Sequence, residues 1–468
     1  MSKKVLEEIA DIAIDNNLYV FSDEAYEKNE KSFELNLYSK NLVKIMVRLK
    51  RELGLFETTL MGIGIILGAG IYVLIGEAAG IAGNSVWMSF AIASLVAIFT
   101  GLSYAEFSSR FTKDSVEYDY VKNTISDKWG FVVGWMIVFT SLIAAAAVAL
   151  GFAGYFTKLF PSINLGIVTI AFLLIIIFSF LSYWDIRQAA WANVLFTSIE
   201  TFGLLFIIYL GIGKLNSVNY FEMANGFEGV ISAATLVFFA FIGFETIAKL
   251  SEETKNPKKT IPKAILLSIF ISTIIYILVA IASVSILSWD KLAASSAPLA
   301  DVAAVVLGTN AFLFLGIIAL FSTGNTVLII LIGASRQMYG ISKNYKKLES
   351  VSRVSEKRRT PHIAIVVTAL AAIGFSLIGN IGTVAEMTNF AVFASFILVN
   401  FSLIAMRFKE SKPQTKGFRV PFNVYNIPIT AVLGILVSLF LLTQLPMLVI
   451  VSGVVLLISG IIIHKFIS

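Results

Sequence analysis

Cysteine is absent from this sequence, histidine occurs only twice, and charged residues make up only 14% of the 468 positions. Without cysteine the chain can form neither a disulfide framework, nor a thiolate metal site, nor a disulfide-linked complex with a partner subunit. His362 and His464 lie at the ends of apolar stretches and predict no metal site. Hydrophobic residues make up 57% of the sequence, which leaves too little polar surface for a soluble protein of this length.

Apolar stretches long enough to cross a bilayer recur along the whole chain. A hydrocarbon core about 30 Å thick requires roughly 20 apolar residues in a helix. The sequence therefore predicts an all-α polytopic membrane protein with twelve transmembrane helices. These spans are predicted at residues 57–77, 86–108, 129–157, 163–183, 187–212, 227–250, 263–287, 310–340, 361–380, 385–407, 426–444 and 447–466.

The distribution of lysine and arginine predicts how the spans are oriented. These residues accumulate in the cytoplasmic segments of membrane proteins. If the amino terminus is cytoplasmic, all but three of the 36 lie in inner segments, the exceptions being Lys158, Lys214 and Lys291. We therefore predict a multi-pass protein of the cell membrane with both termini in the cytoplasm. The net charge of +6 then lies beside anionic lipid and requires no nucleic-acid partner.

The spans divide the chain into three predicted parts. Residues 1–50 are polar and form a cytoplasmic tail, and residues 426–468 supply two additional C-terminal helices. Between them lies a core of residues 51–408, in which spans one to five (51–213) and six to ten (227–408) are two candidate repeats. The longest outer connection, residues 288–309, is expected to form an extracellular amphipathic helix.

Two spans in corresponding places of these repeats contain signs of interruption. The first carries the glycine-rich stretch GIGIILGAGIYVLIGEAAG (62–80), although glycine in a helix interior costs about 1 kcal/mol relative to alanine. The sixth has Gly243 and Glu245 inside the apolar run LVFFAFIGFETIAKLSEE (236–253). Glycine in one membrane helix often serves close packing. Glycine-interrupted segments in matching positions of two halves instead indicate a transporter site built on broken helices.

Four motifs occur in order along the chain: IGIILGAGIYVLIG (63–76), SYAEFSSRF (103–111), FFAFIGFETIAKLSEETKNPKKTIPKAI (238–265) and SRQMYGISKN (335–344). Together they resemble the amino acid–polyamine–organocation superfamily, closest to its cationic-amino-acid-transporter-like branch. The resemblance implies a five-plus-five inverted repeat with broken first and sixth helices, and secondary active transport of amino acids by alternating access. One departure is the segment 112–116, where relatives have a Pro-x-Ala-Gly-Gly stretch.

The resemblance places a small-molecule ligand, an amino acid, between the two broken helices. Free N–H groups at a helix start bind anions, so Gly68, Ala69 and Gly70 are candidates for holding the ligand carboxylate. Freed carbonyl groups are candidates for the ammonium group, and Asn325 of the eighth span borders the same place. Phe239 matches the aromatic lid of relatives and is a candidate gating residue, with packing as the alternative. The candidate carbonyls belong to Ile65, Ile66, Phe239, Ala240 and Ile242.

Glu200, near the middle of the fifth span, is the candidate for ion coupling. Ionisable groups at this depth are costly and mark functional sites. In relatives that couple to protons, the aligned position often carries a lysine. We therefore hypothesise that Glu200 carries a coupling proton. The alternative is a sodium site formed by Glu200, Ser322 and Thr323, and Glu245 is a candidate for a gating hydrogen bond.

These observations favour proton-coupled amino acid uptake, with no enzymatic activity and no cofactor besides the coupling ion. An amino acid exchanger, a polyamine carrier and a membrane sensor that binds an amino acid without moving it stay open. Residues 7–28 also resemble a fragment of a pyridoxal-phosphate aminotransferase, with Asp23 and Tyr26 at its cofactor-contacting positions. The rest of that enzyme is missing, so the tail is predicted to be non-catalytic.

Overall fold

We describe a computed structural model of the chain, in which residues 53–468 form one packing unit. The predicted tail, its aminotransferase-like stretch and most of the departing segment at 112–116 lie outside the described residues. The described residues are 53–111, 116–184, 189–343, 345–355, 358, 360–409 and 417–467.

The described part of the chain is almost entirely helical. The predicted first to fifth spans coincide with helices in the amino-terminal half, where η denotes a 3-10 helix. These helices are α2 (Leu55–Ile66), α3 (Ala69–Ala82), η1 (Gly83–Ser85), α4 (Val86–Arg110), α5 (Val116–Thr124), α6 (Asp127–Leu159), α7 (Ile167–Trp184) and α8 (Ala189–Ile212).

The predicted sixth to twelfth spans coincide with helices in the carboxy-terminal half. These helices are α9 (Gly226–Val237), η2 (Phe238–Phe241), η3 (Phe244–Glu252), α10 (Pro257–Ile286), α11 (Trp289–Ala293), α12 (Pro298–Leu307), α13 (Thr309–Ser342), η4 (Lys346–Leu348), α14 (His362–Ser376), α15 (Ile381–Lys409), α16 (Ile429–Thr443) and α17 (Met447–Ile467). One hairpin of two short strands, β1 (Asn423–Val424) and β2 (Ile427–Pro428), separates α15 from α16.

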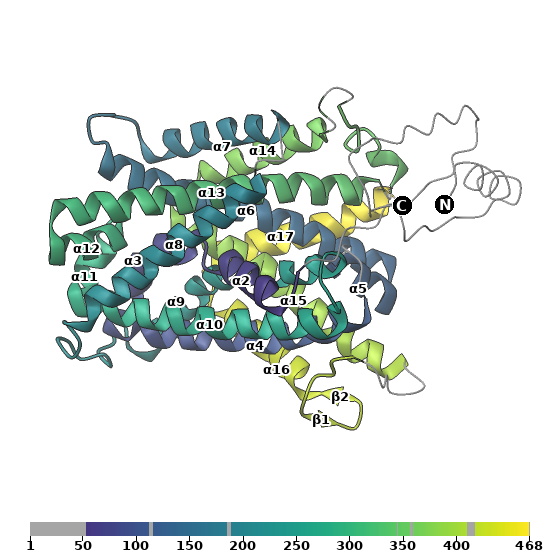
Figure 1. The fold of residues 1–468 in the computed structure, drawn as a ribbon. Helices are drawn as coiled ribbons and strands as arrows, with labels where there is room; N and C mark the ends of the chain where they lie inside the picture. Colours follow the sequence, from purple (N-terminus) through teal and green to yellow (C-terminus); the bar gives the residue numbers. More distant parts are fainter. Residues whose placement is uncertain are drawn as a thin grey trace, which may run out of the picture. The chain divides into compact units, whose positions relative to one another are not determined.

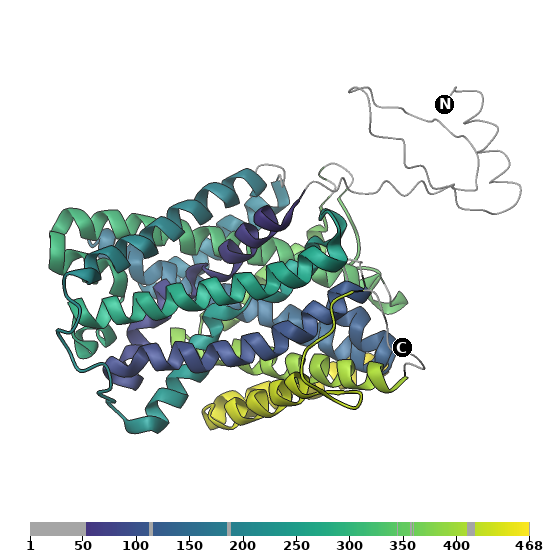
Figure 2. The same ribbon diagram turned by 60° about the horizontal axis from the view of Figure 1, so that its bottom comes forward.

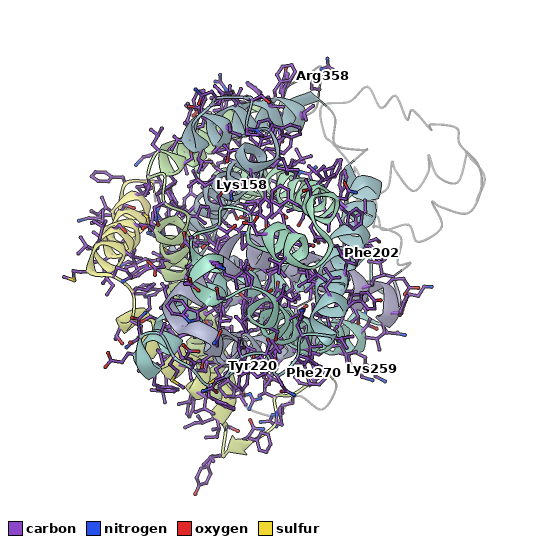
Figure 3. The ribbon with its side chains drawn as sticks, turned by 90° about the vertical axis from the view of Figure 1, so that its left-hand side faces the viewer. Lys158, Phe202, Tyr220, Lys259, Phe270 and Arg358 are labelled. Atoms are coloured by element: carbon purple, nitrogen blue, oxygen red, sulfur yellow. The ribbon has the colours of Figure 1, made fainter. Side chains whose placement is uncertain are left out.

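The helices have the length and surface of membrane spans. Within the described residues, seven helical stretches are long and apolar enough to cross a membrane, and six further apolar helices are shorter. Large apolar side chains point outward from the bundle. Figure 3 looks along the helices and places Phe202 and Phe270 at its rim, where 56% and 60% of these side chains are exposed. The prediction of an all-α polytopic membrane protein is confirmed.

Both predicted interruptions are present. The chain leaves the helical path at Leu67 and Gly68, so the first break includes only the first residue of the Gly68–Gly70 stretch, and Ala69 and Gly70 begin α3. In the sixth span, α9 gives way to two 3-10 segments joined at Ile242 and Gly243. Gly243 has φ +123°, a backbone conformation that residues other than glycine rarely adopt.

Helix packing is consistent with two equivalent groups of five spans. Helix α4 packs against its counterpart α10, and α6 packs against its counterpart α13 (Figures 1 and 2). When each helix of a contacting pair is replaced by its counterpart in the other group, the resulting pair is also in contact. Helix α4 packs on α9 as α10 packs on α2, and α6 packs on α15 as α13 packs on α8. The inverted orientation and the repeat boundaries stay predictions.

Residues 288–309 form two short helices, α11 and α12, so the prediction of one amphipathic helix there is wrong. The helices are separated because Pro298 begins the second of them. Proline has no N–H group and a fixed φ, which suits the first position of a helix but not its interior.

Candidate functional site

A cavity of about 330 Å³ lies between the interrupted helices, with α4, α5, α6, α8, α13 and α15 completing its walls. The structure brings all the predicted substrate residues to this cavity, together with Glu200 and Glu245. The predicted residues that line it are Ile65, Ile66, Gly68, Ala69, Gly70, Phe239, Ala240, Ile242, Asn325, Glu200 and Glu245.

The start of α3 faces the cavity with backbone N–H groups. The first N–H groups of a helix have no acceptor within the helix, and the helix dipole adds positive potential there. Gly68 is the N-cap residue of this 14-residue helix, and Ala69 is its first residue. The N–H of Ala69 points at Oγ1 of Thr326 on α13 from 3.4 Å, a long contact. This end of the cavity can therefore accept the carboxylate of a ligand.

Tyr276 of α10 joins the two breaks. Its fully buried hydroxyl lies 2.5 Å from the carbonyl oxygen of Ile66 and 2.8 Å from that of Ala240. One hydroxyl has one proton, which these two acceptors share. Two of the carbonyls predicted to bind an ammonium group therefore already have a donor, although each oxygen keeps a second lone pair. Sequence reasoning missed Tyr276, because a single tyrosine in an apolar span has the same pattern as a packing residue.

We predict that Tyr276→Phe weakens substrate binding by about tenfold to a hundredfold. The change removes the donor of two buried carbonyl groups, and an unsatisfied buried group costs about 1–3 kcal/mol. Tyr155→Phe is the matched control, because its buried hydroxyl donates to the Tyr72 carbonyl at 2.9 Å, away from the breaks. Substrate-induced thermal shifts of both purified variants measure the effect. Equal affinity in the two variants would contradict the assigned role of Tyr276.

Glu200 of α8 is buried, with 2% of its surface exposed. Its Oε2 accepts a hydrogen bond of 2.7 Å from Oγ of Ser322 on α13. Its backbone carbonyl accepts one of 2.6 Å from the hydroxyl of Tyr72 on α3. Among the described residues the Glu200 carboxylate has no ion-pair partner within 4.0 Å. The group that faces it is a neutral hydroxyl.

Ser322 and Thr323, the two other predicted coupling residues, differ in placement. Neither lines the cavity, but Ser322 reaches it through its bond to Glu200. The Thr323 hydroxyl is fully buried and donates to the Ala319 carbonyl at 2.6 Å, within its own helix. Helix α13 therefore brings Ser322, but not the Thr323 hydroxyl, to the carboxylate.

The opposite part of the cavity contains the predicted Glu245 and two charged groups that sequence reasoning did not predict, Lys249 and Glu117. Glu245, the predicted gating residue, accepts a 2.9 Å hydrogen bond from the N–H of Gly243 and so closes its own turn. Lys249 of η3 lies 3.8 Å from Oε2 of the buried Glu117 on α5. The hydroxyl of Tyr104 and Oε1 of Glu117 are buried without a hydrogen-bond partner among the described residues. Glu117 was missed because it belongs to a loop segment in the sequence prediction.

The remaining walls are mostly apolar. Polar side chains on two helices for which no site residue was predicted at these positions also reach the cavity. They are Ser141 and Gln337, and the Ser141 hydroxyl donates to Oε1 of Gln337 at 3.3 Å. A polar residue inside an apolar span was the only signal that could have found them. The apolar lining side chains include Ile137, Ala144, Val148, Ile329, Ile330, Val392 and Phe396.

A bundle of apolar helices, with two interrupted members around a central cavity, defines a membrane transporter of small molecules. The chain belongs to the amino acid permease family, whose sequence pattern it matches over residues 53–463. It is thus a multi-pass membrane protein that transports amino acids, and not an enzyme. The resemblance to the amino acid–polyamine–organocation superfamily is confirmed.

Characterised relatives span most of the chain. The branched-chain amino acid permease BcaP of Bacillus subtilis is 31% identical over 439 residues, covering 89% of this chain and 92% of the relative. The methylthioribose transporter of the same organism is 29% identical over 419 residues, covering 85% and 89%. Cationic amino acid transporter 4 of Mus musculus is 29% identical over 390 residues, covering 78% and 61%.

Proposed function

We propose that this protein takes up an amino acid together with a proton, by alternating access, and that Glu200 carries the proton. The observation that carries the proposal is the shared cavity. The N–H groups that begin α3, the carbonyl groups beside the breaks and the Glu200 carboxylate all line it. A zwitterion presents one carboxylate and one ammonium group, which these two kinds of backbone group suit. In the cell we propose a plasma-membrane location with both termini cytoplasmic, on the distribution of lysine and arginine.

The surroundings of Glu200 favour a proton over a sodium ion. Sodium is bound by several oxygen ligands, and the predicted set required the Thr323 hydroxyl. That hydroxyl donates within α13 and does not line the cavity. Ser322 alone faces the carboxylate at 2.7 Å, and one hydroxyl suffices to orient a carboxyl group that gains and loses a proton. A proton can bias the transport cycle only if the inward and outward states bind it with different affinity.

Among amino acids, we propose those with apolar side chains as substrates. The cavity walls beyond the backbone groups are formed largely by isoleucine, valine, alanine and phenylalanine side chains. A relative named as a branched-chain amino acid permease supports the same class. A cationic amino acid is the second candidate, because Glu245 and Glu117 also line the cavity and only Lys249 among its described lining residues is basic. Competition by each of the twenty amino acids against labelled leucine separates the two.

Proteoliposomes test the transport mode. We expect an inward proton gradient without sodium to drive accumulation of a labelled amino acid above its external concentration. A requirement for internal substrate would instead indicate exchange, and competition by spermidine would indicate a polyamine carrier. Binding without any accumulation would identify a sensor. Accumulation that requires a sodium gradient would replace the proton by sodium.

A further inference from the structure

The hairpin between α15 and α16 carries aromatic and apolar side chains that the described part of the chain leaves largely exposed. Figures 1 and 3 show β1 and β2 projecting from the edge of the helix bundle. Tyr425 in the turn is 97% exposed, Val424 of β1 is 53% exposed, and Phe422, directly before β1, is 77% exposed. A water-exposed loop gains nothing from three such side chains, since exposing apolar surface to water is unfavourable.

The root of the hairpin is fixed to the helices by a buried ion-pair network. Glu106 of α4, fully buried, pairs with Arg110 of its own helix and with Arg407 of α15. The same carboxylate accepts a 2.8 Å hydrogen bond from the N–H of Val420, at the root. Arg407 also donates to Asn423 of β1. The tip is therefore presented from a rigid base, at the membrane face where α15 ends and α16 begins.

The backbone holds the two aromatic residues in an unfavourable conformation. Phe422 has φ +57° and Tyr425 has φ +53°, in the left-handed region. In this conformation a residue other than glycine is destabilised by about 1–2 kcal/mol. Glycine would adopt this conformation more readily at both positions, yet both carry aromatic residues that point away from the chain. Backbone strain of this kind is a reason to look for a function of the side chains.

The flanking sequence carries positive charge, whereas the tip carries none. Residues 408–419 contain Lys409, Lys412, Lys416 and Arg419 against the single acidic residue Glu410, whereas the charge of Arg407 is buried against Glu106. Residues 420–430 contain no charged residue. Aromatic side chains favour the headgroup level of a bilayer, and neighbouring basic residues are attracted to anionic lipid. A neutral aromatic tip beside a basic stretch has the chemistry of that interface.

We propose that this hairpin is an interfacial anchor, whose Phe422, Val424 and Tyr425 side chains lie among anionic lipid headgroups on the predicted cytoplasmic face. The proposal is independent of the transported substrate and of ion coupling. It assigns a role to the Glu106–Arg407 network, which holds the anchor in place.

Single-cysteine spin labelling tests the position of the tip directly, because the natural chain has no cysteine. A nitroxide at Tyr425→Cys is compared with one at Ser350→Cys, an exposed site in another inner connection. Both are reconstituted at low density in vesicles of phosphatidylglycerol and phosphatidylcholine. We expect oxygen to reach the label at 425 more readily than a water-soluble nickel chelate, with the opposite order at 350. Equal chelate access at both sites overturns the proposal, as does immobilisation of the 425 label by a second protein copy.

A variant that relieves the strain separates anchoring from folding. In Phe422→Gly/Tyr425→Gly the turn keeps a conformation that glycine adopts freely, so the fold is retained. We expect it to lose part of the thermal stabilisation that these vesicles give the wild type relative to detergent, because the aromatic side chains that contact lipid are missing while the basic stretch is unchanged. Asn216→Gly is the control, because Asn216 also has positive φ (+64°) but lies in an outer connection. An undiminished lipid effect in the double variant overturns the proposal.

Discussion

We expect replacement of Glu200 with glutamine to abolish proton-driven accumulation while leaving substrate binding and exchange intact, if Glu200 carries the coupling proton as proposed. Glutamine keeps the size of the side chain and can still pair with Ser322, but it cannot gain or lose a proton. The glutamine side chain therefore acts as a permanently neutral substitute for the carboxyl group. The transport cycle continues without its coupling ion, so substrate equilibrates across the membrane and does not accumulate.

The expected loss is large. An imposed gradient of two pH units stores about 2.7 kcal/mol, enough for about a hundredfold accumulation with one proton per substrate and no membrane potential. The wild type should approach that ratio in sodium-free proteoliposomes, and Glu200→Gln should remain near one. Ser322→Ala is the control, because it removes the 2.7 Å hydrogen bond but keeps the carboxyl group, and it should still accumulate substrate. Undiminished accumulation by Glu200→Gln would remove this residue from the mechanism.

The sequence sufficed for those parts of the site that follow from position along a helix. Glycine clusters in matching spans predicted where both breaks occur, because a membrane helix tolerates irregular backbone only beside a cavity or ligand. Ser322 and Asn325 are three residues apart, a spacing that places two side chains on the same side of a helix. The structure accordingly brings Ser322 to Glu200 and Asn325 to the cavity wall. Thr323, one residue further along the same helix, faces elsewhere.

What the sequence could not supply are contacts made across the fold. Tyr276 is 210 residues from Ile66 and 36 from Ala240, and no local pattern indicates that its hydroxyl reaches both breaks. Glu117 lies in a helix of nine residues in a connection, where a carboxylate is normally solvated. The second strand of the hairpin was part of a predicted apolar span from residue 426, since Ile427 and Pro428 extend the apolar run that α16 continues. These features depend on tertiary packing, which periodicity does not record.

The sequence allows two interpretations of Gly70: its backbone approaches the ligand, or its backbone approaches another helix. Both apply. Gly70 lines the cavity, and a Cβ atom built on it would lie 2.6 Å from Cα and 2.9 Å from Cβ of Ala240. Real Cβ atoms are not found at such distances, so the two broken segments can approach only because residue 70 has no side chain.

Gly70→Ala should therefore eliminate transport and weaken substrate binding by roughly tenfold or more. The added methyl group pushes α3 away from η2, and overpacking of this kind costs about 1–3 kcal/mol. Because both segments provide backbone groups to the cavity, their separation displaces the predicted carboxylate and ammonium sites together. Gly70→Val, with a larger side chain, should reduce binding further. Its effect on binding could not be separated from an effect on folding. Binding of the alanine variant is measured by substrate-induced thermal shift in purified protein.

Gly333→Ala is the matched control for Gly70→Ala. Gly333 also lines the cavity, but a Cβ atom built there has nothing within 4 Å. The same chemical change at this position should leave folding unaltered and reduce binding at most slightly, because it occupies open space without moving a helix. If the two alanine variants bind substrate equally well, the close approach of Gly70 to Ala240 is not required for the site. If Gly333→Ala alone loses binding, the ligand lies against α13 and not at the start of α3.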